Sequence, residues 1–505
     1  MHWADVFTSK LEGYQVISTG ISPSGPIHVG NMREILTGDI IYRSCIDRNL
    51  ETRFIYLCDD MDPLRKRYPF LPEGFQEHVG KPLYRIPSPS GEGSYSEHYL
   101  IPFLRTLDRI EVRSETIFTH QLYREGFFAD VIDLAMKRRH DIKKILESMS
   151  GRKIEGDWYP YNPVCENCNK ITDATIKSYV FPYVYYECKC GHSGRSDVRK
   201  DDGKMPWRVE WPAKWLKLKV TVESFGKDHA AAGSSYDTGK EIIEKVMGGK
   251  APSGIVYEHI FLKGKGAMHS STGITIAASD MVQFAPPEII RFLIAKNNPG
   301  RHIDFDPGIG LLNLVEEFDR YRMAYHGEGE VPDEDFKRVY EFSRISTSEM
   351  EVSVGFRHLV TLVQIYSDTE SLQAAIERSG YRVDVNKEPI KSRIEEAKLW
   401  LALYAPEDVK FTLLPGDLEV KVSESEFRFI ADLSEALSGV EWKPDSIHNT
   451  IYEEIGKSGI EQRAAFQLLY RILIGKTRGP RLGYFLSNLS RQFVIKRLSS
   501  CSVSS

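Results

Sequence analysis

The stretch from Ser18 to Glu34, STGISPSGPIHVGNMRE, combines residue types that could bind a phosphate. Glycines and prolines break it into a loop, and apolar residues at helical spacing follow it. A helix start offers unpaired N–H groups and the positive end of the helix dipole, which favour an anion. His28 could donate to an oxyanion, and Gly30 would let a flat purine approach the backbone. A strand-to-helix turn without a ligand is the structural alternative.

A second candidate site is formed by four of the seven cysteines, namely Cys165, Cys168, Cys188 and Cys190. They form a C-x2-C pair and a C-x-C pair separated by 19 residues, a spacing that suits a tetrahedral zinc site. Free reduced cysteines are the alternative. Because C-x-C is tighter than the usual C-x2-C, His192 remains an alternative fourth ligand. Zinc would supply folding energy on the order of 10 kcal/mol to a segment with little core.

Two further stretches could line a pocket. The acidic run DDMD follows an expected strand at 53–58, and carboxylates at the carboxyl end of a parallel strand face the ligand crevice. A solvated acidic loop is the alternative. Three tryptophans within residues 207–215, with Glu210 between them, could be core or could wall a pocket for an alkyl chain ending in an ammonium.

Two glycine-bearing loops complete the set of candidate sites. The run FGKDH at 225–229 precedes an expected helix from Asp237, and His229 there favours a site over a structural role. After an expected strand at 256–262, the segment 263–273 carries glycines, hydroxyls and two lysines, so it could close over a triphosphate. A surface hairpin is the alternative for this segment.

The elements that must position these residues follow an α/β order. A short strand at 14–17, a helix at 32–50 and a strand at 53–58 predict a parallel βαβ unit. Residues 123–149 have a helical pattern, and residues 183–186 a strand pattern. From about residue 311 apolar residues fall at helical spacing, for example Phe427, Ile430, Leu433 and Leu437.

Length and charge bound the possibilities. A chain of 505 residues predicts roughly three to four domains. The net charge of −5 gives no overall indication of a nucleic-acid partner. Residues 461–505, however, carry eight basic residues against one acidic residue. Arg478 and Arg481 lie in this tail, which is a reasonable footprint for RNA phosphates; a solvated helix face is the alternative. No apolar run long enough for a membrane span, no signal peptide and scattered cysteines predict a cytoplasmic protein.

The motifs together resemble those of a known enzyme family. Pro23, Gly25, His28, Val29, Gly30 and Asn31 resemble the HIGH signature of class I aminoacyl-tRNA synthetases. Over nearly the whole chain, the sequence resembles an archaeal-type class I lysyl-tRNA synthetase. The further runs that carry this resemblance are DDMDPLRK, GKPLYRIPSP, the cysteine cluster, RVEWPAKW, FGKDHAAAGSSYDTGKEI, APPEIIRFLIAK, HIDFDPGIGLLNL, YAPEDVKF and GPRLGYFL.

The resemblance implies an α/β fold: a Rossmann-type parallel-sheet catalytic domain with a zinc-bearing insert, followed by all-α C-terminal domains. The expected divisions are 1–115 and 206–310 for the catalytic halves, 116–205 for the insert, 311–350 for a stem-contact region and 351–505 for a helical anticodon-binding domain. It also implies ATP-dependent activation of lysine and its transfer to the 3′ end of tRNA(Lys), with Mg²⁺ accompanying ATP. No DNA partner and no membrane partner are expected.

Site roles follow from the same resemblance. His28 and Lys265 are the expected catalytic residues. The expected ATP-binding residues are Pro23, Ser24, His28, Gly30, Asn31, Lys265, Met268, Ser270 and Ser271. The expected amino-acid pocket is formed by Gly20, Ser22, Trp211, Asp228, His229 and Tyr257. Zinc is expected on Cys165, Cys168, Cys188 and Cys190, and tRNA on Arg478 and Arg481.

One departure concerns the family's second signature, which is similar to KMSSS. Here it reads Ala267-Met268-His269-Ser270-Ser271, so the lysine position holds Ala267. Loss of that ammonium would weaken stabilisation of the transition state, and Lys265 on the same loop could substitute for it. Two alternatives therefore stay open: a tRNA-binding relative that has lost activation, and another class I synthetase such as a glutamyl- or arginyl-tRNA synthetase.

Overall fold

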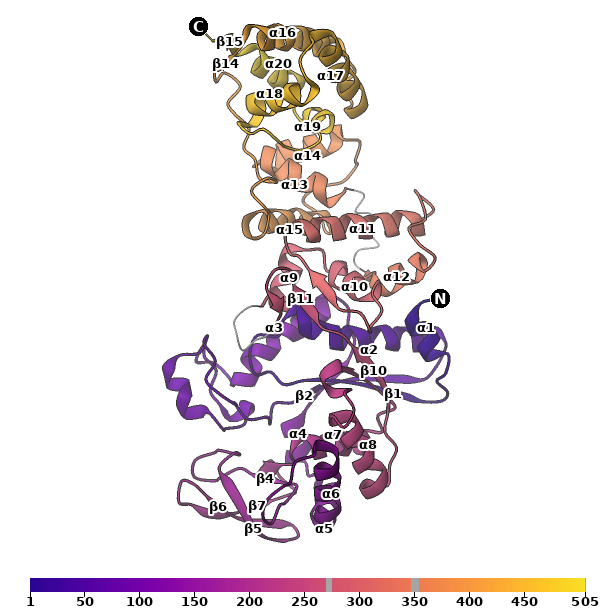
Figure 1. Ribbon diagram of the computed structural model, residues 1–505, viewed down its shortest axis with the longest axis vertical. Coiled ribbons are helices and arrows are strands. Elements are labelled where there is room, and N and C mark those ends of the chain that lie inside the picture. The colour runs from indigo at the N-terminus through magenta and orange to yellow at the C-terminus, as the bar shows by residue number, and fades with distance from the viewer. Residues whose placement is uncertain (269–274, 347–353, 505) are drawn as a thin grey trace. The chain divides into compact units, whose positions relative to one another are not determined.

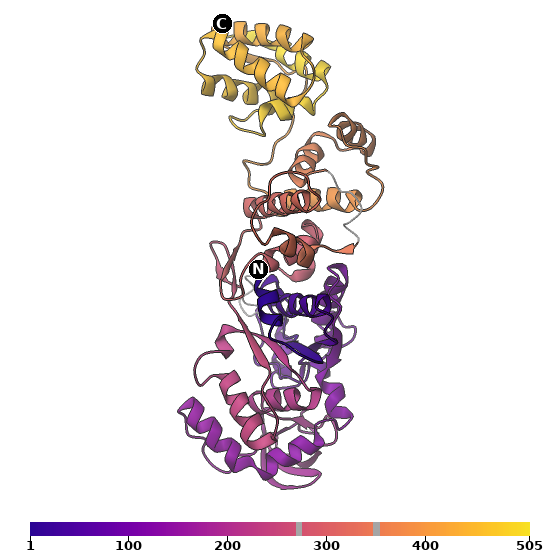
Figure 2. The same ribbon diagram turned by 90° about the vertical axis from the view of Figure 1, so that its right-hand side faces the viewer.

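The computed structural model describes residues 1–268, 275–346 and 354–504 (Figures 1 and 2). It divides into two compact units. The first comprises Met1–Val282, Pro287–Phe305 and Tyr321–Ile345, and the second comprises Gln283–Pro286, Asp306–Arg320 and Ser346–Ser505. The five-part division expected from the sequence stays a prediction. Among the described residues, no helix is long and apolar enough to cross a membrane.

The first unit is built on a five-stranded parallel sheet in the order β10-β9-β1-β2-β3. The strands are β1 (Gln15–Ile21), β2 (Thr52–Cys58), β3 (Glu115–Phe118), β9 (Val222–Gly226) and β10 (Ser253–Tyr257). The strand order reverses between β1 and β9, and ligands of such sheets bind at the carboxyl ends of the strands there. This confirms the Rossmann-type sheet. The expected strand at 14–17 was too short, because β1 continues through Gly20.

Helices cover both faces of this sheet (Figure 1). Ser224 of β9 donates to the carbonyl of Glu34 on α2 (Val29–Asp47), whereas Glu223 accepts from tryptophans of α7 (Trp207–Leu218). Adjacent strand residues point to opposite faces, so α2 and α7 lie on opposite sides. The remaining helices before the insert and beside α7 are α1 (Trp3–Thr8), α3 (Tyr95–Arg109) and α8 (Ser235–Ile242).

Helix α2 is tied to later parts of the chain by a buried arginine. Arg33 is fully buried, and its Nη2 donates to the carbonyl oxygens of Asn298, Pro299 and Arg301 at 3.0–3.1 Å. These carbonyls lie between α10 (Glu288–Ala295) and β13 (Ile303–Phe305). The sheet's first helix is thus anchored by residues more than 260 positions away.

An insert separates β3 from α7. Its helices are α4 (Thr119–Arg124), α5 (Ala129–Lys137) and α6 (Arg139–Ser150), and its strands are β4 (Asn162–Pro163), β5 (Ala174–Val180), β6 (Tyr183–Cys188), β7 (Ser193–Asp197) and β8 (Gly203–Lys204). The helical pattern expected at 123–149 is confirmed as parts of three helices; one continuous helix would be wrong. Gly126 has φ +70° and follows α4, and Arg138 leaves helical geometry between α5 and α6.

The strand expected at 256–262 is also wrong, because it is two strands in two sheets. β10 ends at Tyr257, and β11 (Ile260–Leu262) pairs with β13 and with β12 (Gly266–Ala267). The amide of Glu258 donates to Pro299 instead of continuing the first sheet. Helices α9 (Ala278–Phe284) and α12 (Phe336–Ser343) complete this region.

The second unit is helical, as expected. Its helices include part of α11 (Ile309–Tyr325) and then α13 (Phe356–Ile365), α14 (Thr369–Arg378), α15 (Ile390–Leu403), α16 (Glu424–Gly439), α17 (Pro444–Ser458), α18 (Gln462–Ile474), α19 (Leu482–Ser487) and α20 (Arg491–Ser499). The one deviation among its described residues is a short parallel pair, β14 (Val420–Val422) with β15 (Cys501–Val503). Ile430, Leu433 and Leu437 of α16 are buried, so their helical spacing marks the core face, whereas Phe427 is 37% exposed.

Candidate active site

The start of α2 brings His28, Gly30 and Met268 together. His28 is the N-cap of α2, and its amide donates to Asn31 Oδ1 at 3.1 Å. A Cβ added to Gly30 would lie 2.8 Å from the His28 ring and 3.7 Å from Cβ of Met268. Only glycine therefore leaves room for the ring at this position. The two signature stretches that the sequence analysis assigned to one nucleotide site meet here.

Backbone bonds hold this loop from both sides. The amide of Val29 donates to Ile276 and that of Ala278 to Ile27, both at 2.9 Å. On the other side, the Tyr95 hydroxyl donates to the carbonyl of Ser24 at 2.7 Å, and Pro23 is buried. The described residues on both sides of 269–274 therefore lie against the helix start.

Lys265 lies at the tip of the hairpin between β11 and β12. Its side chain is exposed, and its amide donates to Leu262 at 2.9 Å. The hairpin turns through Gly264 and Gly266, both at positive φ, a conformation that favours glycine. Ser270 and Ser271, also expected to bind ATP, lie outside the described residues.

Glu34 is a pocket residue that the sequence analysis missed. Its Oε1 accepts from the amide of Gly20 at 2.6 Å, and its Oε2 accepts from the Tyr257 hydroxyl at 2.8 Å. Burial raises the pKa of Glu34 to about 7. The signal in the sequence was an acid one helical turn after Gly30, at the start of the helix that follows the glycine-rich loop.

The tryptophans within residues 207–215 both line the candidate pocket and pack in the hydrophobic core. Trp215 is buried and Trp211 nearly so, and their indole N–H groups donate to the two oxygens of Glu223 at 3.1 and 2.9 Å. Burial raises the pKa of Glu223 to about 8. The ring of His229 packs against Trp211, with 5.8 Å between centroids, and burial lowers its pKa.

The expected pocket residue Asp228 points elsewhere. Its side chain is largely exposed, and its carboxylate lies 3.3 Å from Nε2 of His259. The residue precedes His229 in a short turn after β9, so its neighbour reaches the tryptophans while Asp228 faces outward. The structure thus groups Gly20, Trp211, His229 and Tyr257 more closely than it groups Asp228 with them.

A buried charge network lies under Ser22. The Ser22 hydroxyl donates to Asp62 Oδ2 at 2.6 Å, and Lys204 Nζ donates to Asp62 Oδ1 at 2.6 Å. Burial opposes the charge of Asp62, but attraction by Lys204 lowers its pKa below the ordinary value. Lys204 belongs to β8 at the base of the insert, so the insert contributes directly to this pocket.

The neighbouring acid Asp59 is also paired with a buried lysine, but burial raises its pKa above the ordinary value. Lys214 of α7 bonds Asp59, and it also lies 3.2 Å from Glu210, which pairs with Lys204 at 2.9 Å. The acidic run therefore ends at the crevice as expected, but Asp59 and Asp62 are partnered by lysines of α7 and the insert base, and Asp60 is partnered by His120 of α4.

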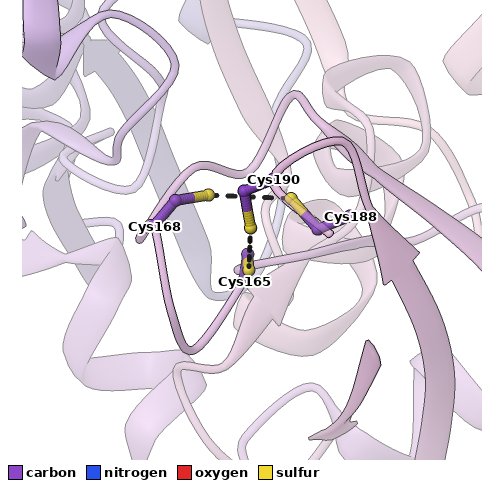
Figure 3. Close-up of side chains that lie close together, drawn as sticks. All are labelled: Cys165, Cys168, Cys188 and Cys190. Atoms are coloured by element: carbon purple, nitrogen blue, oxygen red, sulfur yellow. Dashed lines mark hydrogen bonds between the residues drawn. The ribbon is translucent and has the colours of Figure 1, made fainter. Parts of the chain in front are cut away.

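The four cysteines expected to bind zinc come together in the insert (Figure 3). Their sulfurs all lie within 4.8 Å of one another, with Cys165 to Cys190 and Cys168 to Cys188 at 3.6 Å. Tetrahedral zinc with bonds of about 2.3 Å separates its sulfurs by about 3.8 Å, so this set fits the ion. His192 is outside the set; its Nε2 lies 3.8 Å from Glu166. The cluster could hold a metal ion.

In the second unit, both arginines expected to contact RNA are exposed. Arg478 precedes and Arg481 follows the Gly479-Pro480 turn between α18 and α19. The Pro480 carbonyl accepts from the Tyr470 hydroxyl, which fixes the turn on α18.

The parallel sheet, the helix start with His28 and Gly30, and the hairpin beside it define a nucleotide-binding enzyme of the class I synthetase type. A protein-family model described as tRNA synthetases class I (K) matches residues 1–346. The chain belongs to this family.

Relatives of known name extend over the whole chain. The lysine–tRNA ligase of Picrophilus torridus is 54% identical and that of Thermoplasma acidophilum 51% identical, with 99% of this chain and 99% and 98% of the relatives covered. The lysine–tRNA ligase of Archaeoglobus fulgidus is 43% identical over 99% of this chain and 100% of its own. Among solved structures, a glutamate–tRNA ligase from Elizabethkingia meningosepticum covers 96% of this chain and 98% of its own at 12% identity and a TM-score of 0.44, too low to carry an argument.

Proposed function

We propose that this chain ligates lysine to tRNA(Lys). Lysine's carboxylate attacks the α-phosphate of ATP, giving lysyl-adenylate and pyrophosphate, and the lysyl group then passes to the 3′ end of the tRNA. No enzyme nucleophile is needed, so the protein contributes positioning and charge stabilisation. Full-length relatives at 43–54% identity carry the name lysine–tRNA ligase, which favours this activity over that of a glutamyl- or arginyl-tRNA synthetase.

The observation that carries the proposal is the arrangement of Gly20, Glu34 and Tyr257 at the carboxyl ends of the strands. A lysine side chain ends in an ammonium, which requires an acceptor of opposite charge in a buried site. Glu34 is partly exposed, and each of its oxygens accepts a single recorded bond. Glu223 is buried with both oxygens occupied by indoles, so Glu34 is the better partner for the ε-ammonium.

The nucleotide would bind at the start of α2. His28 and Asn31 would contact the phosphates, and Gly30 would leave space for the adenine. Pro23, Ser24, Met268, Ser270 and Ser271 would complete the ATP site, with Lys265 supplying the mobile cation. Mg²⁺ would accompany ATP through its phosphates. These roles are supported by the closeness of Gly30 to both the His28 ring and Met268.

Zinc would be held by Cys165, Cys168, Cys188 and Cys190, whose sulfur spacing suits it. It would hold the insert in shape, and Lys204 at the base of that insert would hold Asp62 and, through it, Ser22. The tRNA would contact the second unit at Arg478 and Arg481.

The test is lysine-dependent exchange between ATP and pyrophosphate, with and without tRNA(Lys). We expect exchange with lysine and none with glutamate or arginine. Exchange with glutamate or arginine in place of lysine would contradict the proposal. If the chain binds tRNA but exchanges with no amino acid, it is a relative that has lost activation, an alternative suggested by Ala267 in place of the loop lysine.

A further inference from the structure

Glu223 is a buried carboxyl group that holds two tryptophans of one helix. It belongs to β9 and is 4% exposed. Its Oε1 accepts from the indole N–H of Trp211 at 2.9 Å, and its Oε2 accepts from that of Trp215 at 3.1 Å. The two tryptophans are one helical turn apart on α7, so they lie on the same face of that helix. A single carboxyl group therefore fixes the orientation of both rings.

No positive charge offsets this carboxyl group among the described residues. Its register partners in the sheet are Ser18 of β1 on one side and Gly254 of β10 on the other. The charged group that acts on it is another acid, Glu34 of α2. Burial raises the pKa of Glu223 to about 8. Because a buried carboxylate without a cation is costly, the neutral acid is the favoured form near pH 7.

The two buried lysines of this region are engaged by other acids. Lys214 of α7 bonds Asp59, and Lys204 of β8 bonds Asp62 at 2.6 Å. Both lysines also contact Glu210, at 2.9 and 3.2 Å. Neither ammonium therefore compensates a charge on the carboxyl group of β9.

The proton of the neutral acid has an acceptor in reach. Ser18 pairs in register with Glu223 and lies close enough to act on its pKa. The Oγ of Ser18 is buried and forms no hydrogen bond of normal geometry with any described residue. A carboxyl O–H that donates to this oxygen would satisfy it. The neutral acid thus accepts from two indoles and donates to one hydroxyl.

The rings held by Glu223 pack tightly. The ring centroid of Trp211 lies 4.9 Å from that of Trp207 and 4.7 Å from that of Trp215. A Cβ added to Gly239 would lie 2.8 Å from the ring of Trp215, which leaves that ring no room toward α8. A displacement of Trp215 would therefore be passed to Trp211.

We infer that Glu223 is a positioning residue of the lysine pocket, which as a neutral acid holds the indoles of Trp211 and Trp215 and so orients the ring against which the alkyl chain of lysine packs. With Glu223 neutral, the pocket presents one negative charge, on Glu34, to the single ammonium of the lysine side chain. The inference rests on the proposed function in taking Trp211 as a wall of the lysine pocket.

The first test observes the indole N–H groups of the full-length chain without substrate, by NMR of protein labelled with ¹⁵N in tryptophan. Trp211→Phe and Trp215→Phe assign the two signals. Both signals should shift with one common midpoint near pH 8, because ionisation of Glu223 strengthens both hydrogen bonds. Trp400 is the matched control, since its indole donates to the carbonyl of Pro307, which does not titrate, and its signal should stay fixed.

Two other groups near these rings can titrate, and both are distinguishable. Burial lowers the pKa of His229, so its titration falls well below pH 8. Glu34→Gln removes the other buried acid, and the shared midpoint should persist in that variant. A shared midpoint below about pH 6 would show that Glu223 is ionised at neutral pH. Signals that shift independently would show that no single group holds both rings, and either result would overturn the inference.

The second test measures the affinity for lysine by calorimetric titration. Glu223→Gln has a single carbonyl oxygen and an NH2 group, so one indole N–H would face a donor instead of an acceptor. We expect lysine to bind about tenfold more weakly to this variant. Trp215→Phe removes the second indole N–H, so in that background the amide oxygen serves Trp211 alone. There, Glu223→Gln should weaken binding less than about twofold.

Glu34→Gln is the control for this comparison, because Trp215→Phe should not reduce the effect of losing the carboxylate that binds the ammonium. Equal effects of Glu223→Gln in both backgrounds, or no effect in either, would contradict the inference. The first test uses the wild-type carboxyl group, so it decides the state of Glu223 even if Glu223→Gln does not fold. A wild-type chain that binds no lysine would contradict the proposed function, whereas the indole signals would still report the state of Glu223.

Discussion

At the scale of single residues, the raised pKa of Glu34 predicts how the affinity for lysine depends on pH. Its pKa is raised by burial to about 7, whereas the ammonium of lysine stays protonated to a pH of about 10. An ammonium binds the ionised carboxylate, so lysine affinity should increase as the pH rises from about 6 to about 8. Glu34→Gln should bind lysine about 10–100-fold more weakly at pH 8 and lose this dependence.

The measurement is the KM for lysine in pyrophosphate exchange over that pH range. Glu115→Gln is the control, because Glu115 is a surface carboxylate of the same sheet, paired with Arg53. If Glu34→Gln keeps the wild-type pH dependence, Glu34 does not bind the ammonium.

His28 should act on the rate and not on lysine affinity. If its ring donates to the phosphates as charge develops, His28→Ala should raise the activation barrier by roughly 2–4 kcal/mol. Single-turnover formation of lysyl-adenylate measures this step, and His140→Ala, on the exposed face of α6, is the control. An activation rate equal to that of the wild type would remove His28 from the site.

Ala267 stands where the family's second signature has a lysine, and Lys265 is the nearby residue expected to replace it. Lys265→Ala should lose most activity, because its exposed ammonium on the hairpin tip is the expected substitute for the missing lysine. Ala267→Lys should preserve or raise activity. The comparison uses kcat for exchange at saturating lysine, with Lys250→Ala as the surface control. A silent Lys265→Ala in an active protein would show that another group stabilises the pyrophosphate.

At the scale of elements, the insert should depend on its metal. Cys168→Ser with Cys188→Ser removes one cysteine from the C-x2-C pair and one from the C-x-C pair, so elemental analysis should find one zinc per wild-type chain and none in the double variant. The variant should also melt at a lower temperature, because the metal supplies folding energy to a segment of short strands. Cys45→Ser, with Cys45 buried outside the cluster, controls for loss of a thiol. A wild-type chain purified without metal would refute the zinc assignment.

Some elements and contacts could be predicted from the sequence, and others could not. The strand, loop and helix around His28 were predictable, because Gly20, His28 and Gly30 act within one local segment. The bond between Glu34 and Tyr257 was not, since the two residues are 223 positions apart and meet only when β10 joins the sheet.

The wrongly predicted strand boundaries also result from contacts between residues that are far apart in the sequence. The strand-like stretch from 256 to 262 looks continuous in the sequence, but tertiary pairing with β13 moves its second half into another sheet. Likewise the acidic residues after β2 were expected at the crevice, while their lysine partners could not be known before the insert base and α7 were placed. The cysteine cluster was predictable because the spacing of the cysteines along the sequence alone indicates a metal site.

At the scale of the whole molecule, a chain of net charge −5 must bind a polyanion through a local basic surface. Arg478→Gln with Arg481→Gln should weaken tRNA binding and reduce the slope of log K against log salt by about one to two units, since each lost phosphate contact releases fewer counterions. Fluorescence anisotropy between roughly 50 and 200 mM salt measures both.

Lysine activation without tRNA should be the same in this double variant as in the wild type, which checks that the first unit is intact. Arg382→Gln with Lys391→Gln, another basic pair of the second unit, is the control for net charge. An unaltered salt slope in the Arg478 and Arg481 variant would place the RNA surface elsewhere.

The buried guanidinium of Arg33 bears on how the chain is made. The acceptors of its Nη2 lie at residues 298–301, which are synthesised long after α2 and also after the five strands of the parallel sheet. At roughly 5–20 residues per second, the stretch from Arg33 to Arg301 takes on the order of 15–50 s to synthesise. Throughout that interval the nascent chain carries a cation that must stay in water, so α2 docks late and the nucleotide loop at its start is completed near the end of synthesis of the first unit.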